Sequence, residues 1–536
     1  MSTYGQKRDD EYLNRLKSSG PISDFITSYN ANLSAPHRTI FLFPGGMGSQ
    51  LLRATADVYQ GPPFFYLTAW IDPFIWAGTV VNLQTQTPPD YDDYQQHFVV
   101  PNGCIDCPGL EPYVGFINWC QNSNIDLFVF GWDWRLSSEA TANFFLNRFL
   151  PAFDSLATSA GCSPHPLDNF WLVGHSFGGM VVKQILNQST NQYVQRIKRA
   201  ITVGSPFYGY GGRVHRYFKG DSQINWTLNP NGAQRAAEIV STLPGGYELL
   251  FLPEATYNNN QSAFANDPDG YNLLAYPSVD ATNPGQRADP YHPIPTPPAT
   301  DPNGKVRYIS SCGFDMNLLV AGKAASDKIT LALNSSVRNK FYNIRGVGNG
   351  NTVTSQTWKL VPQGFNPNTD PDPITDTLGP GDGTLPAWST RLLGLSKGHV
   401  TSVPVNIEHM DMMNNTSVQI EIAKLLQPTP SLFAHMSLMA KRHPVKIKTA
   451  SRTELNRLIR QLDRTTSGED ISPEERRAVI RGRLKRYSPE ELQELLARGY
   501  LDALKSPSQL SGRPTRTKKP DVPPNANAAN RGDKPR

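Results

Sequence analysis

Short apolar runs that end in glycine or in turn residues alternate with helical patterns along the first 440 residues of the chain. The runs occupy residues 39–43, 127–130, 170–173, 200–203, 306–310, 341–344 and 403–407. Helical patterns such as residues 179–187 separate several of them. This alternation predicts a mostly parallel sheet with helices on its faces. In such a sheet an active site lies at the carboxyl ends of the strands.

Ser176 stands in the segment with the strongest chemical pattern, NFWLVGHSFGGMVVKQIL at residues 169–186. An apolar run leads directly into Gly-x-Ser-x-Gly and then into a helical pattern, which is the setting of a nucleophile elbow. Glycines on both sides of the serine permit a tight turn, and the helix directs its amide dipoles to the site. We therefore predict an α/β-hydrolase fold in which Ser176 is the nucleophile.

Backbone amides that stabilise an oxyanion are expected at two places in this fold. One is the amide of Phe177, the residue after the serine. The other lies in the glycine-rich loop of TIFLFPGGMGSQL, residues 39–51, which follows a predicted strand. We expect Gly46 to supply the second amide, with Met47 as the alternative.

An acid and a base should follow the nucleophile in the chain order Ser, Asp or Glu, His. His409 follows the last apolar run, and Asp382 lies between it and Ser176 in the glycine-rich turn LGPGDGTLPAWS. We predict that His409 is the general base and that Asp382 holds its imidazole in the productive tautomer. His399, before the last run, and Asp315, after the run at 306–310, are competing candidates.

The chain resembles the lecithin:cholesterol acyltransferase family, which includes phospholipid:diacylglycerol acyltransferases and lysosomal phospholipase A2-type enzymes. The resemblance rests on segments that occur in the family's order across about residues 38–425: PGGMGSQL, WID, GWDWRLS, GHSFGG, GSPFYG, LPGGYELLFLP, GDGTLPAWST and EHMDMM. It implies a lipid acyl-ester hydrolase or O-acyltransferase with Ser176, Asp382 and His409 as its triad, and Gly46 and Phe177 as its oxyanion donors. Gly46 departs from the family, because several relatives carry a larger residue there.

Charge separates a basic tail from the rest of the chain. The whole sequence has a net charge of +5, whereas residues 441–536 hold 23 Lys and Arg against 12 Asp and Glu. Two Ser-Pro-Glu-Glu capping boxes, at 472–475 and 488–491, predict short helices within residues 451–505. Residues 506–536 are rich in Pro, Asn and basic residues with little to bury, which predicts disorder.

The predicted organisation follows from these boundaries. Residues 1–37 form an N-terminal extension and residues 38–425 the catalytic domain, followed by a linker at 426–450. Within the catalytic domain, residues 52–125 are an aromatic-rich insertion, and residues 210–300, rich in Tyr, Asn and Pro, form a cap or lid. A lid of this kind opens at a lipid surface.

Substrate contacts are expected from the loop after the first strand and from the aromatic-rich insertion. The candidates are Met47, Trp70, Phe74 and Trp76. Burial of the aromatic side chains in the insertion itself is an equally good interpretation. Partners are therefore expected to be a lipid or other acyl ester and, transiently, a membrane surface, with the basic tail against an anionic surface and no nucleic acid.

No Sec signal and no apolar run long enough to span a membrane are visible in the sequence. We therefore expect a cytoplasmic protein or one exported by a non-Sec route. Five cysteines cannot all pair, and the scattered Cys120, Cys162 and Cys312 fit a reducing compartment. Cys104 and Cys107 are two loop thiols or one local disulfide, because no second ligand pair completes a zinc site. The predicted chemistry needs no metal and no organic cofactor.

Three hypotheses about function remain open at this point. The first is a lipid acyl-ester hydrolase or acyltransferase that works through an acyl-enzyme. The second is an esterase on the same scaffold that acts on small soluble esters or polyesters. The third is an inactive scaffold protein attached through its basic tail.

Overall fold

The computed structural model describes residues 4–18, 20–32, 37–54, 66–70, 99–105, 111–211, 242–274, 276, 278–279, 290–291, 305–307, 315–358, 360–362 and 374–426. All of them belong to one compact unit, Met1–Lys446, and none to the second unit, Ile447–Arg536. The predicted linker after residue 426, the helical region at 451–505 and the tail at 506–536 therefore lie outside the described residues.

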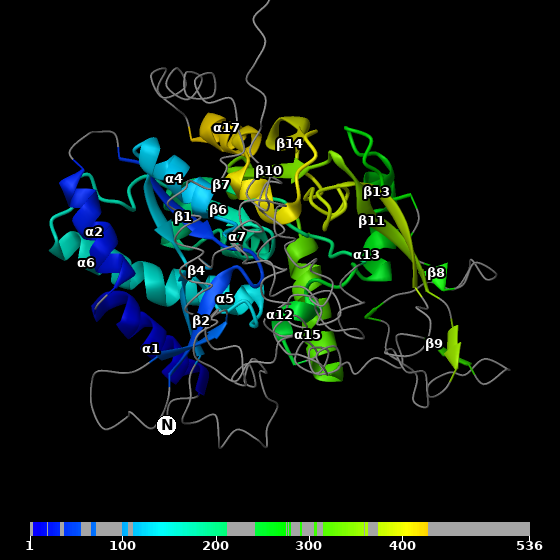
Figure 1. Ribbon diagram of the computed structural model, residues 1–536, viewed down its shortest axis with the longest axis horizontal. Coiled ribbons are helices and arrows are strands. Elements are labelled where there is room, and N and C mark those ends of the chain that lie inside the picture. The colour runs from blue at the N-terminus through cyan, green and yellow to red at the C-terminus, as the bar shows by residue number, and fades with distance from the viewer. Residues whose placement is uncertain are drawn as a thin grey trace, which may run out of the picture. The chain divides into compact units, whose positions relative to one another are not determined.

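A six-stranded sheet forms the centre of the first unit (Figure 1). Its order is β14 (Val400–Val403), β10 (Phe341–Gly346), β7 (Ile197–Val203), β6 (Phe170–His175), β1 (Thr39–Phe43) and β5 (Asp126–Val129). Every neighbouring pair of strands is parallel, so all the carboxyl ends lie along one edge. This topology confirms the predicted parallel sheet of an α/β-hydrolase fold.

Helices cover both faces of the sheet, and each strand supplies side chains to both. On β1, Phe41 and Phe43 belong to the larger core cluster, whereas Ile40 and Leu42 belong to a second cluster. The larger cluster includes residues of α5 (Ser138–Phe144), η3 (Phe145–Phe149), α6 (Leu150–Ser159), α7 (Phe177–Asn187), α8 (Gln192–Arg196), α15 (Met316–Thr330) and α16 (Ser335–Arg338). The second cluster includes α4 (Val114–Asn122) and α17 (Thr416–Leu425). Strands buried on both faces are continuous apolar runs, which is why the sequence shows them clearly.

The N-terminal residues belong to the same core. Helices α1 (Tyr4–Ser18) and α2 (Pro21–Ala31) bury Tyr12, Phe25 and Tyr29 in the larger cluster. The ring of Phe25 lies 5.9 Å from that of Phe128 on β5. The central sheet thus begins at Thr39, and the packed core already includes the preceding helices.

Three small sheets flank the central one. They are β3 (Tyr66–Trp70), β2 (Ser49–Ala54) and β4 (Val99–Cys104); β13 (Ile374–Gly381), β11 (Asn349–Trp358) and β8 (Ser278–Val279); and β12 (Leu360–Pro362) with β9 (Lys305–Arg307). The strand expected at 306–310 is described only in part, as β9, which pairs antiparallel with β12 outside the central sheet. A short apolar run does not specify which neighbour it pairs with, because that choice depends on residues far along the chain.

The last strand of the central sheet also differs from the prediction at 403–407. It is β14, which ends at Val403, because Pro404 follows and has no N–H to continue the ladder. The loop from Pro404 then leads to a 3₁₀ helix, η6 (His409–Asn414). His409 therefore lies beyond the carboxyl edge of the sheet.

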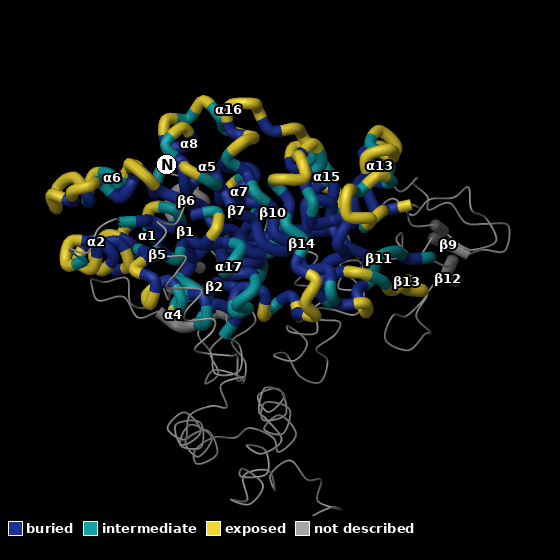
Figure 2. The backbone as a smooth tube through the Cα atoms, turned by 90° about the horizontal axis from the view of Figure 1, so that it is seen from above, coloured by how far each residue is buried: buried dark blue, intermediate teal, exposed yellow. Residues whose placement is uncertain are grey.

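The described part of the predicted cap contains three short helices, α12 (Pro244–Tyr247), α13 (Glu254–Asn259) and α14 (Gln261–Ala265). Their buried residues, among them Tyr247 and Tyr257, extend the larger core cluster. Figure 2 shows β6, β7 and β10 within the buried region, with exposed segments along α6, α13 and α16.

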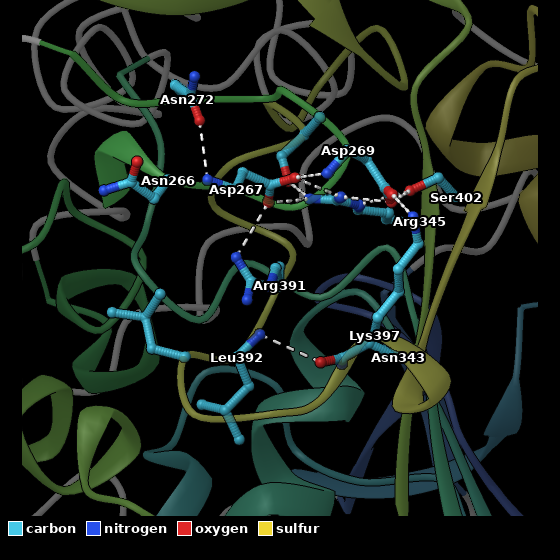
Figure 3. Close-up of polar contacts among 12 residues, drawn as sticks. Asn266, Asp267, Asp269, Asn272, Asn343, Arg345, Arg391, Leu392, Lys397 and Ser402 are labelled. Atoms are coloured by element: carbon cyan, nitrogen blue, oxygen red, sulfur yellow. Dashed lines mark hydrogen bonds and ion pairs between the residues drawn. The ribbon is translucent and has the colours of Figure 1, made fainter. Parts of the chain in front are cut away.

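A buried cluster of charges attaches the loop after α14 to the sheet (Figure 3). The guanidinium of Arg345 on β10 donates two hydrogen bonds to Asp267, at 2.8 and 2.9 Å, and one to Asp269 at 3.0 Å. Its Nε donates to Ser402 Oγ on β14 at 2.8 Å. The side chain of Arg345 is fully buried, so this ion cluster fixes the cap segment against the β10–β14 side of the sheet.

None of the helices in the described part of the chain combines the length and apolar character that a membrane span requires.

Candidate active site

Ser176 occupies a strained turn between β6 and α7. Its backbone has φ 53° and ψ −127°, a region that non-glycine residues seldom adopt. The chain packs very closely around this turn, which is possible only because the residues on both sides of the serine include glycines. A Cβ on Gly178 would lie 2.2 Å from Phe43 O, and one on Gly174 would lie 2.7 Å from Gly178 O. The amide of Ser176 donates to Val203 O on the next strand at 2.9 Å, which holds the elbow at the carboxyl edge.

Two further side chains form a continuous hydrogen-bonded path with the serine. His409 Nε2 lies 2.8 Å from Ser176 Oγ, and His409 Nδ1 lies 2.8 Å from Asp382 Oδ2. Asp382 is fully buried and His409 is 6% exposed, so the Asp382–His409 end of the path is shielded from solvent. The structure thus brings together the three residues that the sequence singled out.

Backbone amides hold the Asp382 carboxylate in place. The other oxygen of this group, Oδ1, accepts hydrogen bonds from the amides of Thr384 and Leu385, at 3.1 and 2.7 Å. Gly383 permits this tight turn with a φ of 85°. Oδ2 is left to face the imidazole of His409.

The loop after β1 lies directly against the elbow. A Cβ on Gly45 would lie 2.8 Å from Ser176 Cβ, and one on Gly46 would lie 3.5 Å from the ring of Phe177. Gly46, Met47 and Phe177 all line the same pocket as Ser176. The structure therefore brings both predicted sources of oxyanion donors to the nucleophile.

The pocket in front of Ser176 is mainly apolar. It encloses about 890 Å³ of empty space, counted out to its open mouth. Apolar and aromatic side chains form most of its wall: Met47, Trp134, Phe177, Pro206, Tyr210, Leu243, Leu249, Leu385 and Met410. Leu243 and Leu249 come from the predicted cap, so the described part of the cap contributes to this wall.

Two buried carboxylates that the sequence pattern does not identify support the pocket wall. Asp133 forms an ion pair with Arg135, with 2.7 Å between Oδ2 and Nη2, on either side of Trp134. Burial alone would raise the pKa of Asp133, but the charge and hydrogen bonds of Arg135 lower it below its ordinary value. Glu248, next to the pocket residue Leu249, accepts hydrogen bonds from the amide and hydroxyl of Ser138. Burial, outweighing these hydrogen bonds, raises the pKa of Glu248 to about 7.

The competing candidates for acid and base have other partners. His399 Nδ1 donates to Phe341 O at 2.8 Å, at the amino end of β10 and therefore at the opposite edge of the sheet from Ser176. The carboxylate of Asp315 accepts from the amides of Asn317 and Leu318 and so caps the N-terminus of α15.

The remaining predicted positions are only partly described. Trp70 lies on β3 opposite Leu51. Phe74, Trp76 and Cys107 lie outside the described residues, so substrate contact by the two aromatic residues and the pairing of Cys104 with Cys107 stay predictions. No group of three or more His, Cys, Asp or Glu side chains that could hold a metal ion occurs in the part of the chain that the structure describes.

Comparison with known proteins agrees with the predicted resemblance. Residues 115–280 match the family model of lecithin:cholesterol acyltransferase, a segment that includes Ser176 and ends before Asp382. This match confirms the resemblance over that segment and supports the general class of acyl-ester hydrolase or acyltransferase. A solved structure described as the crystal structure of the Tle4-Tli4 complex is 17% identical, with a TM-score of 0.39, and the match covers 75% of this chain and 98% of that one. No curated protein matches the sequence.

Proposed function

We propose that this protein is a serine-dependent enzyme that hydrolyses lipid acyl esters or transfers their acyl groups to an alcohol. Ser176 is the nucleophile, His409 the general base and Asp382 the residue that orients the base. The observation that carries this proposal is the hydrogen-bonded path from Asp382 through His409 to Ser176 at the head of α7.

The reaction follows from the orientation of these groups. His409 Nε2 accepts the hydroxyl proton of Ser176 while Oγ forms a bond to the ester carbonyl carbon, and Asp382 stabilises the imidazolium through Nδ1–H. The tetrahedral intermediate collapses, the ester C–O bond breaks, and the leaving alcohol takes its proton from Nε2–H. The acyl group remains on Ser176. Water or a second alcohol, deprotonated by His409, then removes it.

The oxyanion donors are assigned by the hydrogen bonds already formed in the loop after β1. Gly45 N–H donates to the hydroxyl of Tyr113 at 2.6 Å, and Gly48 N–H donates to Gly45 O at 2.9 Å. The amides of Gly45 and Gly48 are thus engaged within the protein, and we assign the second donor to Gly46, which lies against Phe177. The first donor is the amide of Phe177, the first residue of α7.

The wall of the pocket favours a lipid substrate. Its side chains are mostly aliphatic or aromatic, which suits a long acyl chain, because burial of apolar surface is worth about 25 cal/mol per Å². Leu243 and Leu249 add to this wall from the cap. We therefore place the acyl chain between the cap and the loop after β1.

Labelling with a fluorophosphonate probe tests the nucleophile. We expect the wild-type protein to be labelled and Ser176→Ala to lose all labelling. Ser205→Ala is a matched control, since this buried hydroxyl near α7 has no hydrogen-bond partner among the described residues. Labelling that persists in Ser176→Ala would overturn the assignment.

Turnover measurements test the triad and the substrate class. Asp382→Asn should lower kcat by about 10⁴-fold, because the imidazole would then be held in the wrong tautomer. Mass-spectrometric analysis of a defined phospholipid, with and without an added alcohol, identifies the bond cleaved and the acyl acceptor. Higher activity on soluble short-chain esters than on phospholipid vesicles would favour a small-ester or polyester hydrolase instead.

A further inference from the structure

His175, the residue before the nucleophile, takes no part in the chemistry proposed above, yet both of its ring nitrogens are hydrogen-bonded. The side chain is buried, at 1% exposure. Nδ1 lies 3.0 Å from the hydroxyl of Tyr113, and Nε2 lies 3.1 Å from the backbone carbonyl oxygen of His409. A buried histidine is therefore in contact with the residue that carries the base.

The partners of this ring determine where its proton lies. A carbonyl oxygen only accepts hydrogen bonds, so Nε2 of His175 carries the proton and donates to His409 O. Burial, together with the nearby His409, lowers the pKa of His175 well below its ordinary value, so the ring is neutral. Its Nδ1 is then an acceptor, and the Tyr113 hydroxyl donates to it. Burial raises the pKa of Tyr113 above its ordinary value, which keeps this hydroxyl protonated.

The same hydroxyl also binds the loop after β1. Its oxygen accepts a hydrogen bond from Gly45 N–H at 2.6 Å. A directed path therefore runs from Gly45 N–H to the Tyr113 hydroxyl, on to His175 and from there to the carbonyl of His409. The path connects the loop after β1, the residue before α4, the last residue of β6 and the first residue of η6, which meet at the carboxyl edge of the sheet.

We propose that His175 and Tyr113 are positioning residues of this active site, which hold the backbone of the base and the backbone of the second oxyanion donor at fixed places relative to Ser176. This inference rests on the proposed function. His175 fixes the backbone of His409, and Tyr113 fixes Gly45, the neighbour of the assigned donor Gly46. Neither side chain exchanges a proton with the substrate.

The hydrogen-bonded path from Gly45 through Tyr113 and His175 to His409, which we call the neutral bridge, carries no charge beside the base. The rings of His175 and His409 are 4.9 Å apart. His409 becomes an imidazolium during the proposed reaction, and a second positive charge at this distance would oppose that step. A bridge that uses N–H, O–H and C=O groups provides the same geometry without that repulsion.

Three variants separate the links of the bridge. His175→Ala removes both bonds of the ring, whereas His175→Gln keeps an amide N–H that can donate to His409 O. Tyr113→Phe removes the hydroxyl that binds Gly45 and His175. His399→Gln and Tyr29→Phe are matched controls, because each alters a histidine or tyrosine hydrogen-bonded to a backbone carbonyl away from the site.

Steady-state kinetics with a soluble aryl ester, normalised by active-site titration with a fluorophosphonate, measure the effect per folded molecule. We expect His175→Ala to lower kcat on the order of 100-fold, the loss that follows a displacement of about 1 Å in an active site. KM should change much less than kcat, because both side chains line the pocket with only about 1% of their surface exposed and its apolar wall is unchanged. His175→Gln should recover most of the loss, and Tyr113→Phe should lower kcat on the order of tenfold, since one of the loops stays attached.

Equal kcat values for His175→Ala, Tyr113→Phe and the two control variants would overturn the inference. So would losses in His175→Ala and His175→Gln that are the same size, because the donor to His409 O would then be irrelevant. If His175→Ala does not fold, the comparison of His175→Gln with Tyr113→Phe still decides. A wild-type protein without Ser176-dependent labelling contradicts the proposed function instead, so the two failures are distinguishable.

Discussion

Two buried polar networks join distant segments of this protein, and they differ in charge. The bridge through His175 and Tyr113 consists of neutral groups and lies beside Ser176. The cluster around Arg345 consists of two carboxylates, Asp267 and Asp269, with the buried guanidinium of Arg345 and the more peripheral cations of Arg391 and Lys397. It attaches the cap loop to β10 and β14 (Figure 3). Charges beside the base would act on the imidazolium that forms during the proposed reaction, whereas a segment that carries no chemistry tolerates a strong ion cluster. The comparison indicates that the network beside the reacting groups is neutral, whereas the network that only attaches the cap is charged.

Arg345→Met should destabilise the protein more than any other substitution in these two networks. It removes the buried cation that Asp267 and Asp269 share and leaves them only Arg391, at 3.3 Å, and Lys397, at 3.6 Å. Removal of one partner from a buried ion pair costs about 3–5 kcal/mol. Turnover per titrated site should stay close to that of the wild type, because the cluster does not contact Ser176. Thermal or denaturant unfolding, combined with kinetics normalised by active-site titration, measures both quantities. A fall in turnover with unchanged stability would reverse the distinction between the two networks.

Tyr113→Phe is the corresponding change in the neutral bridge. It leaves the buried amide of Gly45 without its partner, which costs about 1–3 kcal/mol, less than the loss in Arg345→Met. Its effect on kcat should be the larger of the two. Unfolding curves for both variants, measured with the same kinetic assay, check this crossed pattern. The comparison fails if Tyr113→Phe loses stability and keeps full turnover.

The sequence predicts the parts of this site that depend on local pattern and chain order. Ser176 is found because its elbow needs strand, glycine, serine, glycine and helix in immediate succession. Asp382 and His409 are found because the fold places them in a known order after the nucleophile. Continuous apolar runs predict most strands of the central sheet, since burial on both faces requires them.

The parts that the sequence does not predict depend on contacts between distant segments. Tyr113 and His175 are 62 residues apart, and Arg345 and Asp267 are 78 apart. Nothing in the local pattern identifies either pair. The sequence does contain a signal for the burial of α2. Its apolar residues have the spacing of one buried helical face: Ile22, Phe25, Ile26 and Tyr29. The sequence does not predict which strand pairs with the run at 306–310, because several sheet edges accept a strand of that length.

Glu248 is a third attachment, between the cap and α5, and its charge depends on pH. Its pKa in the folded protein is about 7, raised from 4.5 by burial, against which the hydrogen bonds from Ser138 act. The unfolded chain releases this proton near pH 4.5 and the folded protein only near pH 7. The free energy of unfolding should therefore fall as the pH rises through this window, by less than about 1.4 kcal/mol per pH unit.

Glu248→Gln removes this titration, because an amide has no proton to release in this range. Unfolding midpoints of the wild type and the variant are measured at several pH values between 4.5 and 8. The midpoint of the wild type should fall relative to that of the variant as the pH rises across that window. Parallel curves for the two proteins would show that Glu248 does not titrate there. The Glu248 attachment is thus neutral at low pH, like the bridge through His175 and Tyr113, and charged at high pH, like the cluster around Arg345.

Asp269→Asn is the smallest of these changes and separates the two carboxylates of the charged cluster. The hydrogen bond from Ser402 and the interactions with Arg345 lower the pKa of Asp269 and outweigh its partial burial, so its stabilising effect is present at neutral pH and is lost as the pH falls below 3.8. Its side chain is 23% exposed, against 4% for Asp267. We therefore expect Asp269→Asn to cost less than about 1 kcal/mol, as for partly solvated ion pairs, and Asp267→Asn to cost clearly more. Equal losses in the two variants would show that solvent does not screen Asp269, and the attachment of the cap would then depend on both carboxylates.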